Sequence, residues 1–232
     1  MSRRLILIRH GQTTYNATGR MQGHLDTELS EMGYTQAEAA ARLLADKGIT
    51  RILASDLRRA AETARVIGEA LGVPVLSDAR LRETNLGDWQ GRRSVDIDEE
   101  FPGARALWRH DPTWAPPGGE SRVDVARRAR PVIDELMESY PEWNDHAVLI
   151  VAHGGAISAL TCQLLGLEVA QFGMLSGLKN THWSQLTARP RFDPETPLAP
   201  ARFTETNVAE ATWYFDGWNM GARVSGDGGA DI

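Results

Sequence analysis

One pattern constrains the fold more than any other, and it occurs twice: an uninterrupted hydrophobic run that ends in histidine and glycine. Residues 4–8 lead into the sequence RHG at 9–11, and residues 147–152 lead into HGG at 153–155. A short hydrophobic run without polar alternation, bounded by glycine, is typical of a strand that is buried on both faces. Such strands belong to mainly parallel sheets that are covered by helices.

The rest of the chain alternates strands with helices. Further strands are predicted at residues 51–55, 73–76, 182–188 and 211–218, and helices are predicted after Ser30, after Asp56, over 120–140 and over 156–165. Ser30 and Asp56 are suitable N-caps, and the glycines at 48, 72 and 166 are suitable helix ends. This alternation predicts an α/β protein: a three-layer α/β/α sandwich with a mainly parallel central sheet.

The pattern breaks down after residue 85. Tryptophans there are interleaved with charges and prolines: Trp89, Trp108 and Trp114. We interpret residues 85–120 as a helical insertion, or cap, whose core these tryptophans fill. The remainder suits one domain over residues 1–224, with a proline-rich loop at 189–207 and a glycine- and aspartate-rich tail at 225–232 that we expect to be disordered.

Composition narrows the partners. The net charge of -6 does not favour nucleic-acid binding, and no apolar run reaches the ~18 residues of a membrane span. The apolar run near the N-terminus is too short for a signal peptide. The single cysteine, Cys162, excludes an intrachain disulfide. We expect a cytoplasmic protein whose partner is a small molecule.

Polar residues follow the ends of the predicted strands. Because ligands of such sheets bind outside the carboxyl ends of the strands, these residues are expected to share one edge. They are Arg9, His10, Asn16, Arg58, Arg59, Glu83 and His153. Guanidinium groups match phosphate oxygens, a neutral imidazole can attack phosphorus, and a carboxyl group can protonate a leaving alkoxide and then deprotonate water. The set therefore favours phosphate-ester chemistry.

Structural explanations stand beside this functional one. A single histidine after a strand is more often structural than catalytic, although two in the same context raise the odds. Glu83 could simply pair with Arg80 or Arg82. Arg58 and Arg59 at a helix start oppose the helix dipole, which favours an anionic partner, but one of the two could be a solvated surface residue.

Metal and nucleotide motifs are absent from the sequence. No metal-ligand spacing connects the remaining histidines, which are His24, His110, His146 and His182. There is no phosphate-binding loop of the Walker type and no dinucleotide fingerprint. We expect neither a metal nor a cofactor.

Five segments together resemble the histidine phosphatase superfamily, also called phosphoglycerate-mutase-like. They follow the family's order across nearly the whole chain: LIRHGQTTYN, RMQGHLDTELSEMG, SDLRRAAETA, RLRETNLGDWQG and VAHGG. The resemblance implies the fold derived above, no metal and a phosphohistidine intermediate.

The resemblance also implies a role for each matching residue. His10 would be the nucleophile and Glu83 the proton donor. The phosphate would be bound by Arg9, Asn16, Arg59 and His153, while Gln22 and Gly23 would lie on the substrate side. Arg58 would remain at the surface.

Within this family the segment after the acid separates two reactions. Mutases carry an Arg-His-Tyr-Gly element there, whereas this chain has Thr84-Asn85-Leu86-Gly87-Asp88-Trp89, which favours hydrolysis. The chain looks most like actinobacterial members that hydrolyse glucosyl-3-phosphoglycerate to glucosylglycerate and phosphate. The alternatives are a broad-specificity sugar-phosphate or phosphoglycerate phosphatase, a phosphoglycerate mutase, and a phosphate-binding protein without turnover. The insertion could also support a homodimer.

Overall fold

The hydrophobic runs of the sequence form the strands of one sheet. The computed structural model describes every residue except 193, 195–201, 205–206, 223 and 225–232. Within the described residues the six strands are β1 (Arg3–Arg9), β2 (Ile49–Ala54), β3 (Val75–Ser77), β4 (Ala147–Ala152), β5 (Trp183–Arg189) and β6 (Thr212–Met220). Their order in the sheet is β3-β2-β4-β1-β5-β6.

Four strands of this sheet are parallel: β1 pairs in parallel with β4, β4 with β2, and β2 with β3. The last two strands are different, since β5 is antiparallel to β1 and β6 is antiparallel to β5. In the register of the central pair, Arg9 lies opposite Ala152. The residues that follow them, His10 and His153, therefore leave the sheet side by side at its carboxyl edge.

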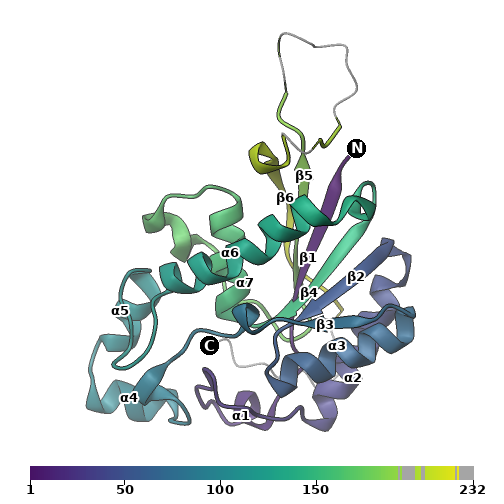
Figure 1. The fold of residues 1–232 in the computed structure, drawn as a ribbon. Helices are drawn as coiled ribbons and strands as arrows, with labels where there is room; N and C mark the ends of the chain where they lie inside the picture. Colours follow the sequence, from purple (N-terminus) through teal and green to yellow (C-terminus); the bar gives the residue numbers. More distant parts are fainter. Residues whose placement is uncertain (193, 195–201, 205–206, 223, 225–232) are drawn as a thin grey trace.

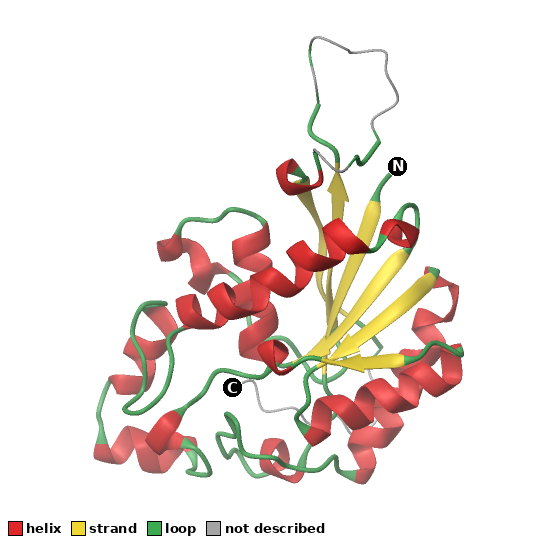
Figure 2. Cartoon of the chain, in the orientation of Figure 1, coloured by secondary structure: helices red, strands yellow, loops and turns green. Residues whose placement is uncertain are grey.

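Helices cover both faces of the sheet, as Figures 1 and 2 show. The described α-helices are α1 (Thr14–Ala17), α2 (Glu31–Leu44), α3 (Arg58–Leu71), α4 (Ser94–Glu100), α5 (Ala104–His110), α6 (Arg122–Ser139) and α7 (Gly154–Leu164). Short 3-10 turns are η1 (Ala45–Lys47), η2 (Ala79–Leu81), η3 (Gly87–Trp89), η4 (Pro141–Trp143), η5 (Val169–Met174) and η6 (Val208–Glu210).

Strand β1 shows how the layers are joined. Ile6 and Ile8 pack with the apolar faces of α2 and α3, while Leu5 and Leu7 pack with those of α6 and α7. All four side chains are fully buried. Alternate residues of one strand thus serve two cores, which explains the unbroken hydrophobic run. The predicted three-layer sandwich with a mainly parallel sheet is confirmed.

Local signals succeeded at α2 and failed at α3. Ser30 caps α2 by accepting a hydrogen bond from the Gly33 N–H, and Gly48 is left-handed at the end of the turn that follows. The prediction that Asp56 caps α3 is wrong, because the N-cap is Leu57 and has no side-chain bond. Asp56 instead forms an ion pair with Arg82.

Two further predictions need correction. Residues 11–29 are not all loop, because α1 forms there around a reciprocal capping pair of Thr13 and Asn16. The strand predicted at 73–76 begins later, at Val75, after Pro74.

The segment after residue 85 has the short helices predicted for it. Trp89 is buried and packs with Met21, Leu86 and Ile97, while Trp108 and Trp114 pack partly exposed against this cluster. Of the predicted loop, residues 193, 195–201 and 205–206 lie outside the described residues, and so does the whole predicted tail at 225–232. Among the helices that are described, none has both the length and the apolar character needed to cross a membrane.

Candidate active site

His10 is held in one orientation by its own backbone neighbour. Its Nδ1 lies 2.7 Å from the Gly11 carbonyl oxygen. Because a carbonyl only accepts hydrogen bonds, Nδ1 carries the proton and Nε2 keeps its lone pair. The Gly11 N–H donates to Thr63 Oγ1 at 3.0 Å, which fixes the turn after β1 against α3. The unprotonated nitrogen, Nε2, is therefore the ring nitrogen that does not bind the turn.

The turn after His10 also requires a close approach of two backbones. A Cβ atom at Gly11 would clash with the carbonyl oxygen of Gly33 at the start of α2. A Cβ atom at Gly33 would in turn clash with the backbone of Gln12. Glycine at both positions therefore lets α2 support the turn that carries the histidine.

The imidazole of His10 is neutral in this setting. Burial is the main cause that lowers its pKa well below the ordinary value, and the charges of Arg59 and then Arg9 lower it further. The side chain is 2% exposed. Arg9 and His10 therefore do not repel each other, because only the guanidinium is charged.

Arg59 is buried at the first turn of α3. Its Nη1 donates to the Leu25 carbonyl at 2.7 Å and its Nη2 to the Gly23 carbonyl at 2.8 Å. Its Nε is buried and has no hydrogen-bond partner among the described residues. Burial lowers the pKa of Arg59 to about 10. A cation that is desolvated to this degree is a strong site for an anion.

The neighbouring Arg58 has the predicted surface position. Its side chain is 58% exposed and forms an ion pair with Glu28, and its backbone N–H donates to Asp26 at 2.7 Å. The loop before α2 thus supplies the acidic groups that the start of α3 needs, and Arg59 alone turns inward.

Two more buried donors face the same region. His153 Nε2 lies 2.9 Å from Ser55 Oγ, and its Nδ1 has no partner within the described part of the chain. Asn16 accepts a hydrogen bond at Oδ1 from the Thr13 N–H at 3.1 Å, while its Nδ2 has no described partner. Burial, followed by the charge of Arg59, lowers the pKa of His153 well below its ordinary value. The rings of His10 and His153 lie with centroids 5.2 Å apart.

Glu83 reaches the cavity from the segment between η2 and η3. Its carboxylate accepts hydrogen bonds from the N–H groups of Thr84 at 2.7 Å, Gly155 at 3.1 Å and Ala156 at 3.0 Å. It therefore caps α7, whose own N-cap, His153, makes no side-chain bond. A Cβ atom at Gly155 would lie 2.6 Å from Glu83 Oε1, so only glycine leaves room for the carboxylate there. Glu83 pairs with neither Arg80 nor Arg82, because Asp78 and Glu135 bind Arg80 and Asp56 binds Arg82.

These groups surround a cavity of about 340 Å³. Seven of the eight residues predicted from sequence line it: Arg9, His10, Asn16, Gln22, Gly23, Arg59 and Glu83. The eighth, His153, is fully buried and packs against the ring of His10. Gln22 is fixed by hydroxyl groups that donate to its Oε1 from Thr13, at 3.1 Å, and Thr27.

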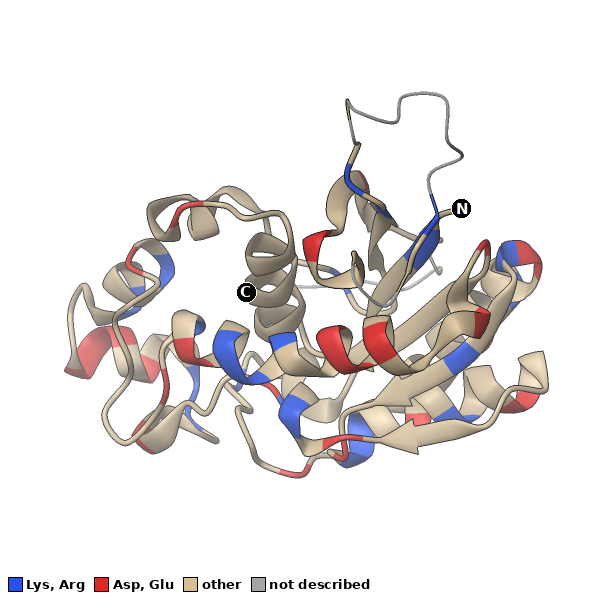
Figure 3. Ribbon diagram, turned by 45° about the horizontal axis from the view of Figure 1, so that its top comes forward, with Lys and Arg blue, Asp and Glu red and all other residues tan. Residues whose placement is uncertain are grey.

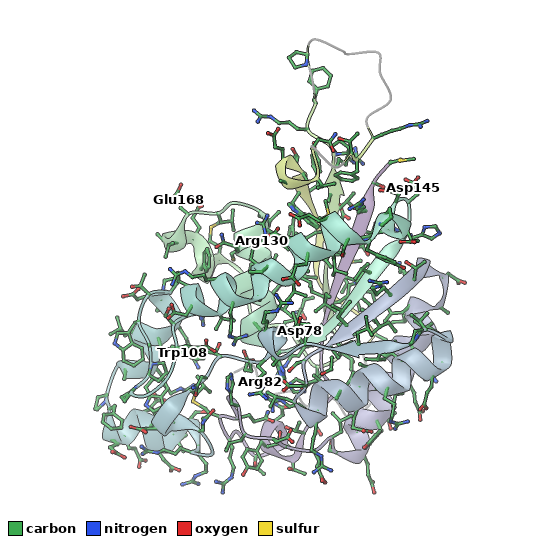
Figure 4. The ribbon with its side chains drawn as sticks, viewed as in Figure 1. Asp78, Arg82, Trp108, Arg130, Asp145 and Glu168 are labelled. Atoms are coloured by element: carbon green, nitrogen blue, oxygen red, sulfur yellow. The ribbon has the colours of Figure 1, made fainter. Side chains whose placement is uncertain are left out.

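Other residues of the cavity were not predicted. Trp108 and Arg109 come from α5, and Arg122 comes from the start of α6. The Arg122 guanidinium carbon lies 5.1 Å from the centroid of the Trp108 ring. Figure 4 shows Trp108 within the insertion, away from the sheet. The only sequence signal for these residues was that tryptophan and arginine recur in the segment without a pattern.

The lowered pKa values of His10 and His153 lead to a prediction of how the stability of the fold depends on pH. Their pKa values are lowered in the folded chain, so the unfolded chain takes up protons first as the pH falls through about 6.5. We expect the free energy of unfolding to fall between about pH 6.5 and pH 5, by up to about 1.4 kcal/mol per pH unit for each histidine. Urea denaturation across this range measures it.

A matched pair of variants isolates the cause of this slope. His153→Asn should flatten it, whereas the same substitution at the exposed His146 should leave it as it is. Asp56 and Asp78 have lowered pKa values, so the stability that they contribute is lost only at a lower pH, through the ordinary range of aspartate and below it. They do not change the slope between about pH 6.5 and pH 5. Equal slopes for wild type and His153→Asn would contradict the assignment.

A neutral imidazole, arginines and a carboxyl group that line one cavity at the carboxyl edge of an α/β sheet are suited to phosphoryl transfer. The family comparison agrees. The model of the Histidine phosphatase superfamily (branch 1) matches residues 5–193, and the chain belongs to this superfamily. The resemblance found in the sequence is confirmed.

Named relatives are similar to this chain over nearly its whole length. A glucosyl-3-phosphoglycerate phosphatase of Mycobacterium tuberculosis (strain CDC 1551 / Oshkosh) is 51% identical over 231 residues, 97% of this chain and 98% of the relative. One from Mycolicibacterium vanbaalenii is 49% identical over 229 residues, again 97% and 98%. A structure of the mycobacterial glucosyl-3-phosphoglycerate phosphatase complexed with VO3 has a TM-score of 0.83 and 50% identity, covering 94% of this chain and 98% of that chain.

Proposed function

We propose that this phosphatase hydrolyses glucosyl-3-phosphoglycerate to glucosylglycerate and phosphate through a phosphohistidine at His10, without a metal ion. One observation carries the chemistry: His10 keeps its Nε2 lone pair in a cavity that also holds buried donors and the carboxyl group of Glu83. The chain's own groups thus supply a nucleophile, positive charge for the phosphate and a proton carrier.

The first step transfers the phosphoryl group to the enzyme. His10 Nε2 forms a bond to phosphorus while the bond from phosphorus to the glycerate oxygen breaks. The electron pair of that bond stays on the departing oxygen, which takes a proton from Glu83. Arg9, Arg59 and Asn16 bind the phosphate oxygens together with His153, whose ring packs edge-on against that of His10.

The second step returns the enzyme to its starting state. A water molecule attacks phosphorus, Glu83 accepts its proton, and the bond from phosphorus to Nε2 breaks with its electron pair returning to the imidazole. Free phosphate leaves. Because Glu83 lost a proton in the first step and regains one here, each turnover closes without an external acid or base.

The outer part of the cavity supports the choice of substrate. Arg20, Arg109 and Arg122 line it, and none of the three forms an ion pair with a carboxylate within the described residues. Arg122 occupies the first turn of α6, where a cation is unfavourable with the helix dipole. A substrate with a carboxylate besides its phosphate suits such a second cationic region, and relatives about half identical are named for such a substrate.

Arg122 gives a prediction for this second region. Arg122→Leu should lower kcat/KM for 3-phosphoglycerate by roughly 30-fold, and for glycerol 3-phosphate by less than about threefold, because only the former has a carboxylate. Steady-state phosphate release from both compounds measures it. Arg127→Leu is the control, since Arg127 lies on the same helix with a side chain that is 75% exposed. Equal losses for both compounds would contradict the carboxylate subsite.

A phosphate-release screen tests the function itself. The substrates are glucosyl-3-phosphoglycerate, 3-phosphoglycerate and sugar phosphates, each with a chelator present. The proposal expects the highest kcat/KM for glucosyl-3-phosphoglycerate. Comparable values for all substrates would favour the broad-specificity phosphatase, 2-phosphoglycerate formed from 3-phosphoglycerate would reveal the mutase, and binding without phosphate release would leave only a phosphate-binding protein.

We also propose a cytoplasmic enzyme that acts on this small molecule and forms a homodimer through its insertion. Exposed apolar side chains of the insertion support the dimer: Val95, Phe101 and Leu107. Light scattering of the purified chain and fractionation of the producing cells test the two proposals.

A further inference from the structure

Glu83 lies on a segment that has no regular structure of its own. The segment leaves η2 at Leu81 and enters η3 at Gly87, so neither a helix nor a strand fixes its backbone. A proton carrier must nevertheless hold its carboxyl group within hydrogen-bond reach of the departing oxygen. The contacts that hold this backbone therefore bear on catalysis.

One arginine of α6 binds a backbone carbonyl at Glu83 and another just before this segment. Arg128 Nη1 donates to the Arg80 carbonyl at 2.7 Å, and its Nη2 donates to the Glu83 carbonyl at 2.7 Å. The same guanidinium binds Glu120 through Nε at 3.1 Å and Nη2 at 2.6 Å. A planar fork with fixed donors is suited to such a task, because it ties a helix to both sides of a loop at once.

Glu120 binds the backbone of the same segment at Asn85. Its Oε1 accepts a hydrogen bond from the Asn85 N–H at 2.8 Å, and its own N–H donates to the Asn85 carbonyl at 2.9 Å. His24 Nε2 lies 2.7 Å from the Glu83 carbonyl, which gives this oxygen a second donor. Both residues on either side of Thr84 are thus bound through their backbones.

The arginines of α6 differ in the partners that they bind. Basic and acidic positions both lie along the ribbon of α6 (Figure 3), and two of its four arginines, Arg127 and Arg130, pair with acids of the same helix. Arg128 differs, because its side chain is only 23% exposed and its four hydrogen bonds all leave the helix, two for the carbonyl groups of Arg80 and Glu83 and two for Glu120. Ordinary helix stabilisation does not require these bonds.

We propose that Arg128, with Glu120, is a positioning residue that aims the carboxyl group of Glu83 at the leaving oxygen. Arg128 is not among the residues that line the cavity, and it acts through the backbone of Glu83. This inference rests on the proposed role of Glu83 as the proton donor. It extends that role by naming what holds the backbone of the acid, while the N–H groups of α7 bind its carboxylate.

Two substrates with different leaving groups distinguish a positioning role of Arg128 from a purely structural one. An alkoxide needs a proton as it departs, whereas p-nitrophenolate leaves as a stable anion. A misplaced Glu83 therefore slows phosphorylation of the enzyme by glycerol 3-phosphate but not by p-nitrophenyl phosphate. A general loss of structure would slow both, and would also weaken binding of inorganic phosphate.

Arg128→Met is the variant of choice, because methionine retains the apolar stem of the side chain. We expect the first-step rate with glycerol 3-phosphate, measured by rapid quench, to fall by between about 10-fold and 100-fold. The burst rate with p-nitrophenyl phosphate and the inhibition constant of inorganic phosphate should change by less than about threefold. Arg130→Met is the matched control, since Arg130, labelled in Figure 4, lies on the same helix and pairs with Asp134.

A second set of variants keeps the test decisive. In the Glu83→Gln background, Arg128→Met should add less than about a twofold loss, because there is no longer an acid to position. Glu120→Gln should reproduce the split between leaving groups in a weaker form. Equal losses for both leaving groups in Arg128→Met, or full additivity with Glu83→Gln, would overturn the positioning role. If Glu83→Gln itself slowed both leaving groups equally, the acid role in the proposed function would fail instead.

Discussion

Replacing His10 with alanine should lower kcat by at least about ten-thousand-fold, because the covalent intermediate can no longer form. The imidazole lines the cavity and keeps the lone pair of Nε2, because its proton is donated from Nδ1 to the Gly11 carbonyl. A brief reaction with substrate labelled in its phosphate, quenched in alkali, should label wild-type protein and leave His10→Ala unlabelled. Alkali is needed because phosphohistidine does not survive acid.

The His10→Ala variant should still bind phosphate although it no longer turns over substrate. Arg9, Arg59 and Asn16 remain, so calorimetry with inorganic phosphate should find an affinity within about tenfold of wild type. His146→Ala is the control, since His146 is exposed and lies outside the cavity. Persistent turnover or a retained label in His10→Ala would overturn the role of His10 as the nucleophile.

The sequence predicted the parts of the site that short-range rules govern. An unbroken hydrophobic run forces a doubly covered strand, and two such runs in parallel must end at one edge. That is why the strand pattern alone was enough to place His10 and His153 together. Arg59 could also be separated from Arg58 once the family's order of segments was recognised, and the structure shows the two pointing apart.

Contacts between distant segments could not be predicted in this way. Asp56 has the right residue type and position for a cap, yet Arg82 competes for its carboxylate and the Arg58 N–H finds Asp26 instead. Likewise Glu83 caps α7 from a segment about seventy residues away, a choice that no local propensity encodes. Local rules describe what a residue can do, and tertiary contacts decide which partner it takes.

The outer cavity escaped prediction for a related reason. Arg122 and Arg128 both come from α6, and their spacing places them on different parts of the helix, one at the cavity and one behind Glu83. In the sequence they are two of several arginines in an amphipathic helix. Only their buried, unequal surroundings distinguish them, and those surroundings are supplied by the insertion and by the loop of Glu83.

Replacing Glu83 with glutamine should lower kcat by about 100-fold to 10,000-fold, the range that general acid and base catalysis contributes. The amide keeps the shape of the side chain but cannot give a proton to the leaving oxygen or take one from water. Both half-reactions therefore slow. Steady-state kinetics with glucosyl-3-phosphoglycerate measure the loss, and competitive inhibition by inorganic phosphate measures what remains of binding.

The inhibition constant of phosphate should change by less than about tenfold in Glu83→Gln, so that the loss lies in kcat. A modest structural effect is also expected. Glu83 Oε2 accepts a hydrogen bond from the Gly155 N–H, and Oε1 accepts one from the Ala156 N–H. The amide nitrogen of glutamine cannot accept a hydrogen bond, so the bond at the oxygen that it replaces is lost. Losing one such bond at the start of α7 costs about 1 kcal/mol of stability, far too little to unfold the chain. A fall in phosphate affinity equal to the fall in kcat would therefore point to a collapsed pocket and count against Glu83 as the proton carrier.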